Sequence, residues 1–391
     1  MVRYPYSFRR RVRLSLKRLL LGTIGWIRAI VRRPYILLVT GDATHAKADE
    51  VEARLRFLLA HLEGELDIRR SLRASPLQYL SCAGVAVADG LALPQIAGKL
   101  PWVADLDFDS NPWDGWRLMD LGTALSRGSR RRFVEDARQV FLEHVRHIQA
   151  DGPRPVYLFG TGPSLRFAAG RSFADGVTIV CNTIVRDPEL WHHLQPAFFA
   201  AGDPIYYFGH NPHARAFRAD ALQRLRESDG RTLFVYPAVF DVLVRPEFRA
   251  IESMLVPIPR GGFGGHADVT VDLTRRFCLP DDGNVLNGLL LPLGCTVGRD
   301  VRLWGFDGRA PGDQGFWANS GRHAYADLIP SIRAAHPAFF AHLVPPGDEV
   351  RYVNRVHGEW LDARLAEAES RGFQFTMLHH SWTATLEKRY R

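Results

Sequence analysis

The residues best suited to chemistry form a short glycine turn near the middle of the chain. Val156–Phe159 is an apolar run typical of a buried strand, and Gly160-Thr161-Gly162-Pro163-Ser164 follows it directly. Glycines let backbone amides approach a phosphate or a ribose closely, and the start of the next helix favours an anion. The spacing is neither GxGxxG nor GxxxxGK[ST], so it predicts neither a dinucleotide fingerprint nor a P-loop. A tight turn without a ligand is the alternative interpretation.

Other predicted strands in this half of the chain also end at polar residues. An Asn or Asp there can bind a base edge or a ribose hydroxyl, or it can cap the next helix. Alternating strands and helices predict a doubly wound parallel sheet, in which ligands lie beyond the carboxyl ends of the strands. These strands, with the polar residues that follow them, are Val177–Cys181 with Asn182, Pro196–Ala200 with Asp203, Thr232–Tyr236, and Val301–Trp304 with Gly305-Phe306-Asp307.

The 391 residues exceed one ordinary core, so we expect more than one structural unit. The apolar patterns predict a strand at Tyr35–Thr40, a helix at Lys47–Leu62 and a strand at Ala83–Ala88. Ser110–Trp116 is typical of a turn or linker, and a helix is expected at Arg131–Gln149. The expected divisions are a basic amphipathic helix at 1–33, a small α/β unit at 34–110, a linker and helix at 111–152, and a large doubly wound, Rossmann-like domain at 153–391.

Composition and charge narrow the classes of function. Hydrophobic residues make up 46% of the chain and charged residues 24%, which excludes wholesale disorder. The four cysteines lie far apart without a CxxC pair, which favours reduced thiols in the cytoplasm. The net charge of +8 comes from 50 basic and 42 acidic residues; residues 1–33 hold ten of the basic residues and no acid, so the remainder carries 40 against 42, a net of −2. The basic character therefore belongs to the N-terminus.

The first 33 residues have the pattern of an interfacial helix. Apolar residues recur every three to four positions, but the uncharged run Leu19–Ile27 has only nine residues, and a spanning helix needs about 20. We expect this helix to bind an anionic leaflet, peripherally on the inner face of the cytoplasmic membrane. The alternatives are a helix packed on another subunit and a nucleic-acid arm. Nucleic acid is disfavoured because no basic and aromatic pattern continues into the folded part.

Neither the histidines nor the acidic residues predict a metal site. The chain has no HExxH motif, and the neighbours in each of His192/His193 and His379/His380 point in different directions. Asp105-Leu106-Asp107-Phe108-Asp109 resembles the acidic metal motif of sugar-nucleotide enzymes. Solvated acids at a strand end are the favoured interpretation of it. We therefore expect no bound metal and no cofactor.

The polar strand ends together resemble a known family. The series Gly160-Thr161-Gly162-Pro163-Ser164, Cys181-Asn182, Gly202-Asp203-Pro204, Asn287-Gly288 and Gly305-Phe306-Asp307 is similar to the bacterial CMP-sialic acid-dependent sialyltransferases of the Campylobacter type. It is also similar to their relatives among the motility accessory factors and an archaeal pterin pyrophosphokinase. The resemblance covers about residues 153–385, and its motifs are specific in order and spacing rather than one by one.

The resemblance implies roles for individual residues. His357 precedes the expected helix Glu359–Ser370 and the strand-like Phe373–Leu378, and it would be the general base. Two tyrosines hydrogen-bond the departing phosphate in the family: Arg309 stands near the position of the first and Phe316 or Trp317 near that of the second. Tyr325 lies somewhat later and could also donate to the phosphate. Thr161 and Asp203 both replace an Asn that the family usually has. The donor nucleotide and its sugar would be bound by Gly160, Thr161, Gly162, Pro163, Ser164, Asn182, Asp203, Asn287, Gly288 and Asp307.

The function implied by the resemblance is glycosyl transfer. The chain would move an acidic sugar of the sialic acid or Kdo type from a CMP-sugar to a glycolipid or polysaccharide hydroxyl, with inversion. A base tuned near neutrality is needed to activate that hydroxyl, and His is suited to it. One alternative is an ATP- and Mg²⁺-dependent pyrophosphoryl or phosphoryl transferase, with Asp307 or the acids at 105–109 on the metal. Another is a non-catalytic nucleotide-binding membrane scaffold. The sequence leaves open whether the chain forms a homo-oligomer.

Overall fold

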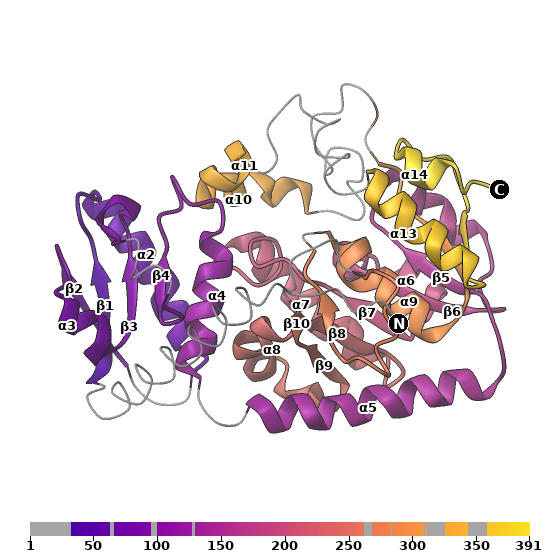
Figure 1. Ribbon diagram of the computed structural model, residues 1–391, viewed down its shortest axis with the longest axis horizontal. Helices are drawn as coiled ribbons and strands as arrows, with labels where there is room; N and C mark the ends of the chain where they lie inside the picture. The colour runs from indigo at the N-terminus through magenta and orange to yellow at the C-terminus, as the bar shows by residue number, and fades with distance from the viewer. Residues whose placement is uncertain are drawn as a thin grey trace, which may run out of the picture. The chain divides into compact units, whose positions relative to one another are not determined.

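The computed structural model describes residues 33–62, 66–94, 100–126, 130–261, 268–282, 284–308, 310, 325–342 and 358–391 (Figure 1). The chain is an α/β protein with two parallel sheets in two compact units. The small unit comprises Met1–Asp107 with Asp120–Leu125, and the large unit comprises Phe108–Met119 with Ser126–Arg391. The expected basic helix at 1–33 lies outside the described residues, apart from the backbone of Arg33.

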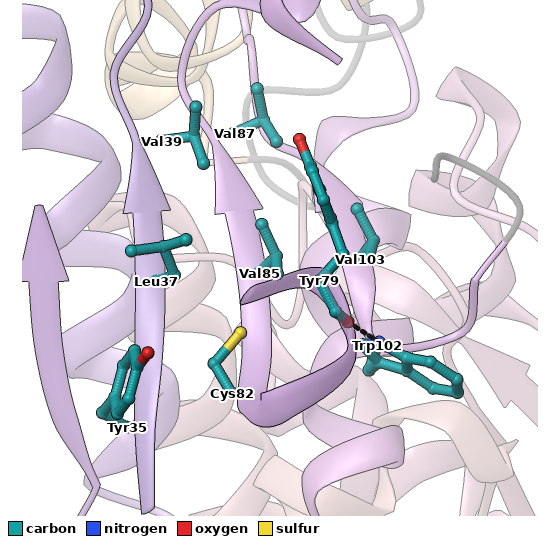
Figure 2. Close-up of a cluster of buried hydrophobic side chains, with 9 residues drawn as sticks. All are labelled: Tyr35, Leu37, Val39, Tyr79, Cys82, Val85, Val87, Trp102 and Val103. Atoms are coloured by element: carbon teal, nitrogen blue, oxygen red, sulfur yellow. Dashed lines mark hydrogen bonds between the residues drawn. The ribbon is translucent and has the colours of Figure 1, made fainter. Parts of the chain in front are cut away.

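The small unit contains a four-stranded parallel sheet in the order β2-β1-β3-β4. Alternate residues of β1 and β3 lie on one face and pack with Trp102, whose Nε1 donates a hydrogen bond of 2.8 Å to the carbonyl of Tyr79 (Figure 2). Thr44 caps the helix α2 by accepting a hydrogen bond from the amide of Lys47. The predicted strands and helix of this unit are confirmed within a few residues. The elements are β1 (Arg33–Val39), α2 (His45–Leu59), β2 (Asp67–Ser71), α3 (Pro76–Ser81), β3 (Cys82–Val87), the 3₁₀ turn η1 (Gly90–Ala92) and β4 (Val103–Asp105).

The large unit contains a seven-stranded parallel sheet in the order β13-β12-β5-β6-β7-β8-β9. From β5 the chain adds strands outward to β9, and it then returns to add β12 and β13 on the other side of β5. The order therefore reverses between β5 and β12, where ligands bind in sheets of this kind. The predicted parallel α/β sheet is confirmed. Its strands are β5 (Val156–Phe159), β6 (Val177–Cys181), β7 (Phe198–Ala200), β8 (Leu233–Pro237), β9 (Leu255–Ile258), β12 (Asp300–Trp304) and β13 (Gln374–Met377).

Helices and short strands complete the large unit. The predicted helices at 131–149 and 359–370 are confirmed as α5 and α13, and α5 packs against β9 and α9. The helices are α4 (Asp114–Leu125), α5 (Arg130–Ala150), α6 (Pro188–Leu194), α7 (Pro212–Glu227), α8 (Asp241–Glu247), α9 (Leu291–Val297), α10 (Ile329–Ala335), α11 (Pro337–His342), α13 (Glu359–Ser370) and α14 (Ala384–Glu387). The 3₁₀-helical segments are η3 (Pro163–Gly170), η4 (Asn182–Arg186), η5 (Ala238–Phe240), η6 (Arg249–Met254) and η8 (Ala326–Leu328), and η7 (Leu286–Leu290) is π-helical. Two short strands, β10 (Arg260–Gly261) and β11 (Leu279–Pro280), pair with each other.

Helix α4 corrects the expectation of a turn at Ser110–Trp116, because the helix already begins at Asp114. Its two halves belong to different units. In the small unit, Leu121 and Leu125 pack against the backbone of Gly84, where an added Cβ would lie 2.9 Å from Leu121 Cδ1. The predicted turn is confirmed as far as Trp113, where Asn111 Oδ1 accepts the amide of Trp113 at 3.0 Å, and only its last three residues belong to the helix.

Asp114 and His336 form a buried pair within the large unit. Asp114 Oδ2 lies 2.7 Å from His336 Nδ1, and both side chains are almost fully buried. Removing the imidazole would leave a buried carboxylate without this partner, which typically costs about 3 kcal/mol. We therefore expect His336→Ala to lower the free energy of unfolding by about 3 kcal/mol, measured by urea denaturation. Exposed His192→Ala is the control, and equal unfolding free energies of the two variants would refute this role.

Two buried histidines predict a loss of stability in mild acid. Burial lowers the pKa of His213 and His144 below the ordinary value of about 6.5. The two imidazoles therefore bind protons more readily in the unfolded chain than in the folded one. The stability that the neutral histidines contribute is fully present above pH 6.5, and it is lost as the pH falls through their lowered pKa values in the folded protein. We expect the free energy of unfolding to fall by up to about 1.4 kcal/mol per pH unit for each histidine. Replacing both by Gln should flatten the profile between pH 6.5 and 5, whereas replacing exposed His192 should not.

Candidate functional site

The glycine turn and the segment after β12 touch each other at the point where the strand order reverses. The amide of Gly160 donates to the carbonyl of Trp304 at 2.7 Å, and the amide of Gly162 donates to that of Gly305 at 2.8 Å. A Cβ on Gly160 would lie 2.5 Å from the Gly305 carbonyl oxygen, and one on Gly162 would lie 2.1 Å from Asp307 Oδ2. The glycines of both motifs are thus required by the close approach of two backbones, a reason that the sequence did not reveal.

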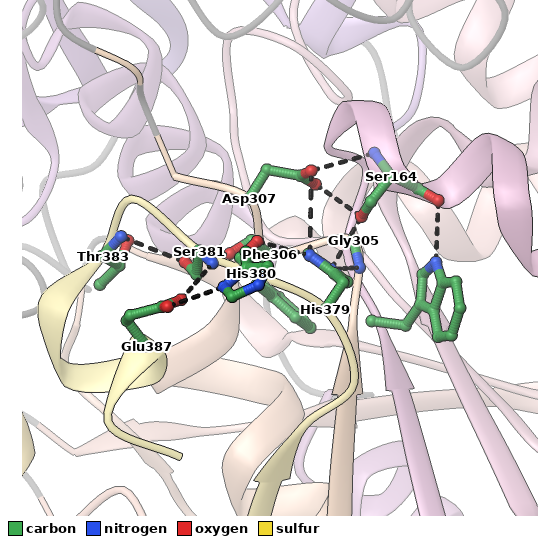
Figure 3. Close-up of polar contacts among 10 residues, drawn as sticks. Ser164, Gly305, Phe306, Asp307, His379, His380, Ser381, Thr383 and Glu387 are labelled. Carbon is green, nitrogen blue, oxygen red and sulfur yellow. Dashed lines mark hydrogen bonds and ion pairs between the residues drawn. The ribbon is translucent and has the colours of Figure 1, made fainter. Parts of the chain in front are cut away.

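Ser164 connects the turn to two other strand ends (Figure 3). Its amide donates to Asp307 Oδ1 at 3.0 Å, and its hydroxyl oxygen lies 2.8 Å from Asp307 Oδ2 and 2.7 Å from His379 Nε2. Its carbonyl accepts a hydrogen bond of 2.9 Å from Trp304 Nε1. The carboxylate of Asp307 therefore occupies the start of η3, where the sequence predicted an anion. A negatively charged side chain at a helix start is stabilising in its own right.

His379 is the residue of this site that sequence reasoning missed as a candidate. Its Nδ1 lies 2.8 Å from the carbonyl of His380, so Nδ1 carries a hydrogen, and Nε2 accepts the amide of Gly305 at 2.9 Å. Ser164 has one hydroxyl hydrogen, which it can donate either to Asp307 Oδ2 or to His379 Nε2. The missed signal was its position just after the predicted strand at 373–378, the same rule that selected Asn182 and Asp307.

Asn182 begins η4 directly after β6, the strand beside β5. Its φ of 54° lies in the left-handed region, which Asn tolerates better than most residues. Its Oδ1 atom is buried and has no hydrogen-bond partner among the described residues. A buried amide oxygen without a partner is costly, and such atoms are concentrated where a ligand or water completes the bond. Strained backbone of this kind is also typical of functional sites.

Thr161 supplies hydrogen-bonding groups in the turn that the protein itself does not use. It lies between two glycines whose amides are engaged, and neither its amide nor its hydroxyl bonds to the part of the chain that the structure describes. The side chain is only partly exposed. Pro163 has no amide hydrogen, and the amide of Ser164 is taken by Asp307. The turn therefore offers Thr161 as its donor to a ligand.

Asp203 shapes the loop after β7. Its Oδ1 accepts the amides of Ile205 at 2.8 Å and Tyr206 at 2.9 Å. Burial raises the pKa of Asp203, while these two hydrogen bonds and the nearby His336 act in the opposite direction. One carboxylate oxygen is therefore committed to a turn, whereas the next helix, α7, is capped by Asn211.

Asn287 and Gly288 lie in η7, which packs against β6. Asn287 is fully buried, and its Nδ2 lies 3.5 Å from Asp282 Oδ2. A Cβ on Gly288 would lie 3.2 Å from the Asp282 carbonyl oxygen. These residues thus hold η7 against the segment at Asp282, beside the strand that ends at Asn182.

The structure places Tyr325 against helix α7. Its hydroxyl donates to Asp220 Oδ2 at 2.5 Å, and the guanidinium of Arg186 lies over its ring at 4.9 Å. Burial, followed by the bond to Asp220, raises the pKa of Tyr325 well above its ordinary value. Its proton is therefore engaged by Asp220 in this state of the protein. The other two predicted catalytic residues, Arg309 and His357, lie outside the described residues.

The acidic motif after β4 is built into the small unit. Asp107 is buried, forms an ion pair with Lys47, and accepts the amide of Gly90 at 3.1 Å. The interpretation as solvated acids is therefore wrong for Asp107. Among the described residues, no three His, Cys, Asp or Glu side chains lie together in a way that could bind a metal ion.

Comparisons with known proteins identified no similar protein. No family model matches the chain, and neither the curated proteins nor the solved structures contain a significant match. Within the described ranges, no helix is both long enough and apolar enough to cross a bilayer.

Proposed function

We propose that the chain is an inverting, metal-independent glycosyltransferase. It would transfer an acidic sugar of the sialic acid or Kdo type from a CMP donor to a hydroxyl of a glycolipid or polysaccharide at the inner face of the cytoplasmic membrane. The observation that carries the proposal is the unpartnered, buried Oδ1 of Asn182 at the strand next to the glycine turn. It supports a nucleotide site at the carboxyl ends of β5, β6 and β12.

The groups available there support recognition of a cytidine nucleotide. A cytosine carries an exocyclic amine, which is a hydrogen-bond donor of the kind that an Asn Oδ1 accepts. Thr161 offers a hydroxyl and an amide to a ribose or a phosphate. Ser164, Asp307 and His379 would keep the turn in place, because they connect the ends of β5, β12 and β13.

The chemistry is a single displacement. The acceptor oxygen forms a bond to the anomeric carbon while the bond from that carbon to the CMP oxygen breaks, which gives inversion. His357 would take the acceptor's proton, and CMP would leave with the bonding electrons. Arg309 and the amide of Thr161 are the donors proposed for the phosphate charge that develops. Such a leaving group has one phosphate, so the proposal requires no metal.

Calorimetric titration tests this proposal. CMP should bind without Mg²⁺ and more tightly than UDP, GDP or ATP. Asn182→Gly keeps the left-handed backbone and removes only the amide, so we expect it to weaken CMP binding by about tenfold or more. Gln195→Gly, at another left-handed position with φ 44°, is the matched control and should bind CMP normally.

Other outcomes of the titration would reassign the function. Binding of ATP only in the presence of Mg²⁺ would replace the proposal with phosphoryl transfer. Absence of nucleotide binding would refute a nucleotide-dependent activity and favour a membrane scaffold. Equal CMP affinity of the Asn182→Gly and wild-type chains would remove Asn182 from the site.

A further inference from the structure

Three large apolar side chains are exposed in the segments that follow β5 and β13. Trp382 is 63% exposed, Phe167 58% and Tyr390 41%. In the described part of the large unit, Trp113 is the only other large apolar side chain with comparable exposure. Single exposed apolar residues are ordinary, but a group at one edge of a sheet indicates an interaction surface.

Contacts with the site place these three residues at the same edge. Phe167 lies three residues after Ser164 in η3, and residues at this spacing lie on one side of a 3₁₀-helix. The amide of Trp382 donates to the carbonyl of Asp307 at 2.7 Å. Tyr390 pairs with Met377, the last residue of β13. Phe167 therefore lies in the segment after β5, Trp382 and Tyr390 lie in the segment after β13, and Trp382 also contacts the residue Asp307 after β12.

Two exposed cations lie in or next to η3, the turn that carries Phe167. The guanidinium of Arg166 lies over the ring of Phe167 at 4.6 Å, and that of Arg171 lies over the ring of Trp304 at 5.2 Å. Both arginines are exposed, and neither forms an ion pair with a described residue. We name Phe167, Trp382 and Tyr390 with Arg166 and Arg171 the aromatic edge.

We propose that the aromatic edge contacts an anionic membrane surface. Trp and Tyr are enriched at the level of the lipid headgroups, and exposed cations are attracted to an anionic leaflet. Stable peripheral attachment usually takes two signals, and residues 1–33 provide ten basic residues without an acid. The aromatic edge would be the second signal. The inference rests on the proposed function in one respect: it would turn the nucleotide site toward a lipid-linked acceptor.

Co-sedimentation of the full chain with vesicles tests the contact. The probes are phosphatidylcholine vesicles with and without phosphatidylglycerol. We expect the Phe167→Ser/Trp382→Ser double variant to partition about tenfold less onto the anionic vesicles than the wild-type chain. Trp113→Ser removes an exposed tryptophan elsewhere in the large unit, so its partitioning should match the wild type. Equal partitioning of the double variant and the wild type would overturn the proposal.

Fluorescence quenching provides a second test that strong binding by residues 1–33 cannot mask. Residues 1–33 contain Trp26, so the variants are compared in a Trp26→Phe background. With brominated phospholipid in the anionic vesicles, adding Trp382→Phe should remove most of the remaining quenching, whereas adding Trp113→Phe should leave it. Unchanged quenching in Trp382→Phe would overturn the proposal. If soluble dextran sulfate but not vesicles changed the fluorescence of Trp382, the edge would bind a soluble polyanion and the proposal would be overturned. A dimer that forms without vesicles and is abolished by the double variant would overturn it in favour of a second copy of the chain. CMP titration of the same variants without vesicles separates this outcome from that of the proposed function.

Discussion

Gly305→Ala should unfold at a much lower urea concentration than the wild-type chain. Gly305 has φ +79°, and an added Cβ would lie 2.3 Å from the carbonyl oxygen of Gly160. The left-handed backbone alone costs an alanine about 1–2 kcal/mol. Overlap with backbone adds about 1–3 kcal/mol, because the carbonyl of Gly160 cannot move without disturbing the strand that precedes it. We expect a total loss of about 3 kcal/mol or more in the free energy of unfolding.

A second glycine separates the two causes. Gly152 has φ +87°, but an added Cβ there would have no atom within 4 Å. Gly152→Ala should therefore show only the backbone cost of about 1–2 kcal/mol. Unfolding free energies that fall equally in the two variants would mean that the contact between the glycine turn and β12 does not contribute to stability.

His357→Ala should abolish most sugar transfer while leaving CMP affinity and stability unchanged. A positioned general base contributes about 10²–10⁴-fold to rate, so we expect the turnover rate to fall by about 10³-fold. His379 cannot substitute, because its Nδ1 is committed to the carbonyl of His380 and its Nε2 to the amide of Gly305. The assay compares turnover with CMP-sugar donors, with calorimetry of CMP binding on the same protein.

His379→Ala is the informative companion to that variant. Loss of the imidazole would remove partners from Ser164 and from the amide of Gly305, so CMP affinity and stability should fall together. A His379→Ala chain that binds CMP normally but transfers no sugar would move the general base from His357 to His379. Full activity of His357→Ala would remove His357 from the proposed mechanism.

The strands of the large sheet were predictable because they are buried on both faces. Val156–Phe159 and Val177–Cys181 are continuous apolar runs that end at turn residues, and both have the predicted bounds. Helix α7 was not predicted, because buried Arg218 and Arg224 interrupt its apolar face. Arg218 donates to Glu247 and to the carbonyls of Tyr207 and Gly209, and such long-range partners leave no periodic signal.

The candidate site was predictable only as a set of strand ends. The rule that ligands lie beyond the carboxyl ends of parallel strands selected Ser164, Asn182 and Asp307 correctly as residues at that edge. The sequence did not reveal which of them touch, since Ser164 and His379 are separated by 215 positions along the chain. It also did not reveal that Asp307 fills the start of η3, because that contact depends on the order of the strands.

The divided helix α4 has a practical consequence for dissecting the chain. A fragment that ends near residue 110 would lack Leu121 and Leu125, the side chains that pack against Gly84. The excised piece would therefore carry an uncovered core and would tend to aggregate. The remainder would keep the whole of α4, and Leu121 and Leu125 in its second half would lose the core against which they pack. No single cut in the sequence separates the two compact units, because Asp120–Leu125 belongs to the small unit. The two units are therefore better probed by point substitution than by deletion.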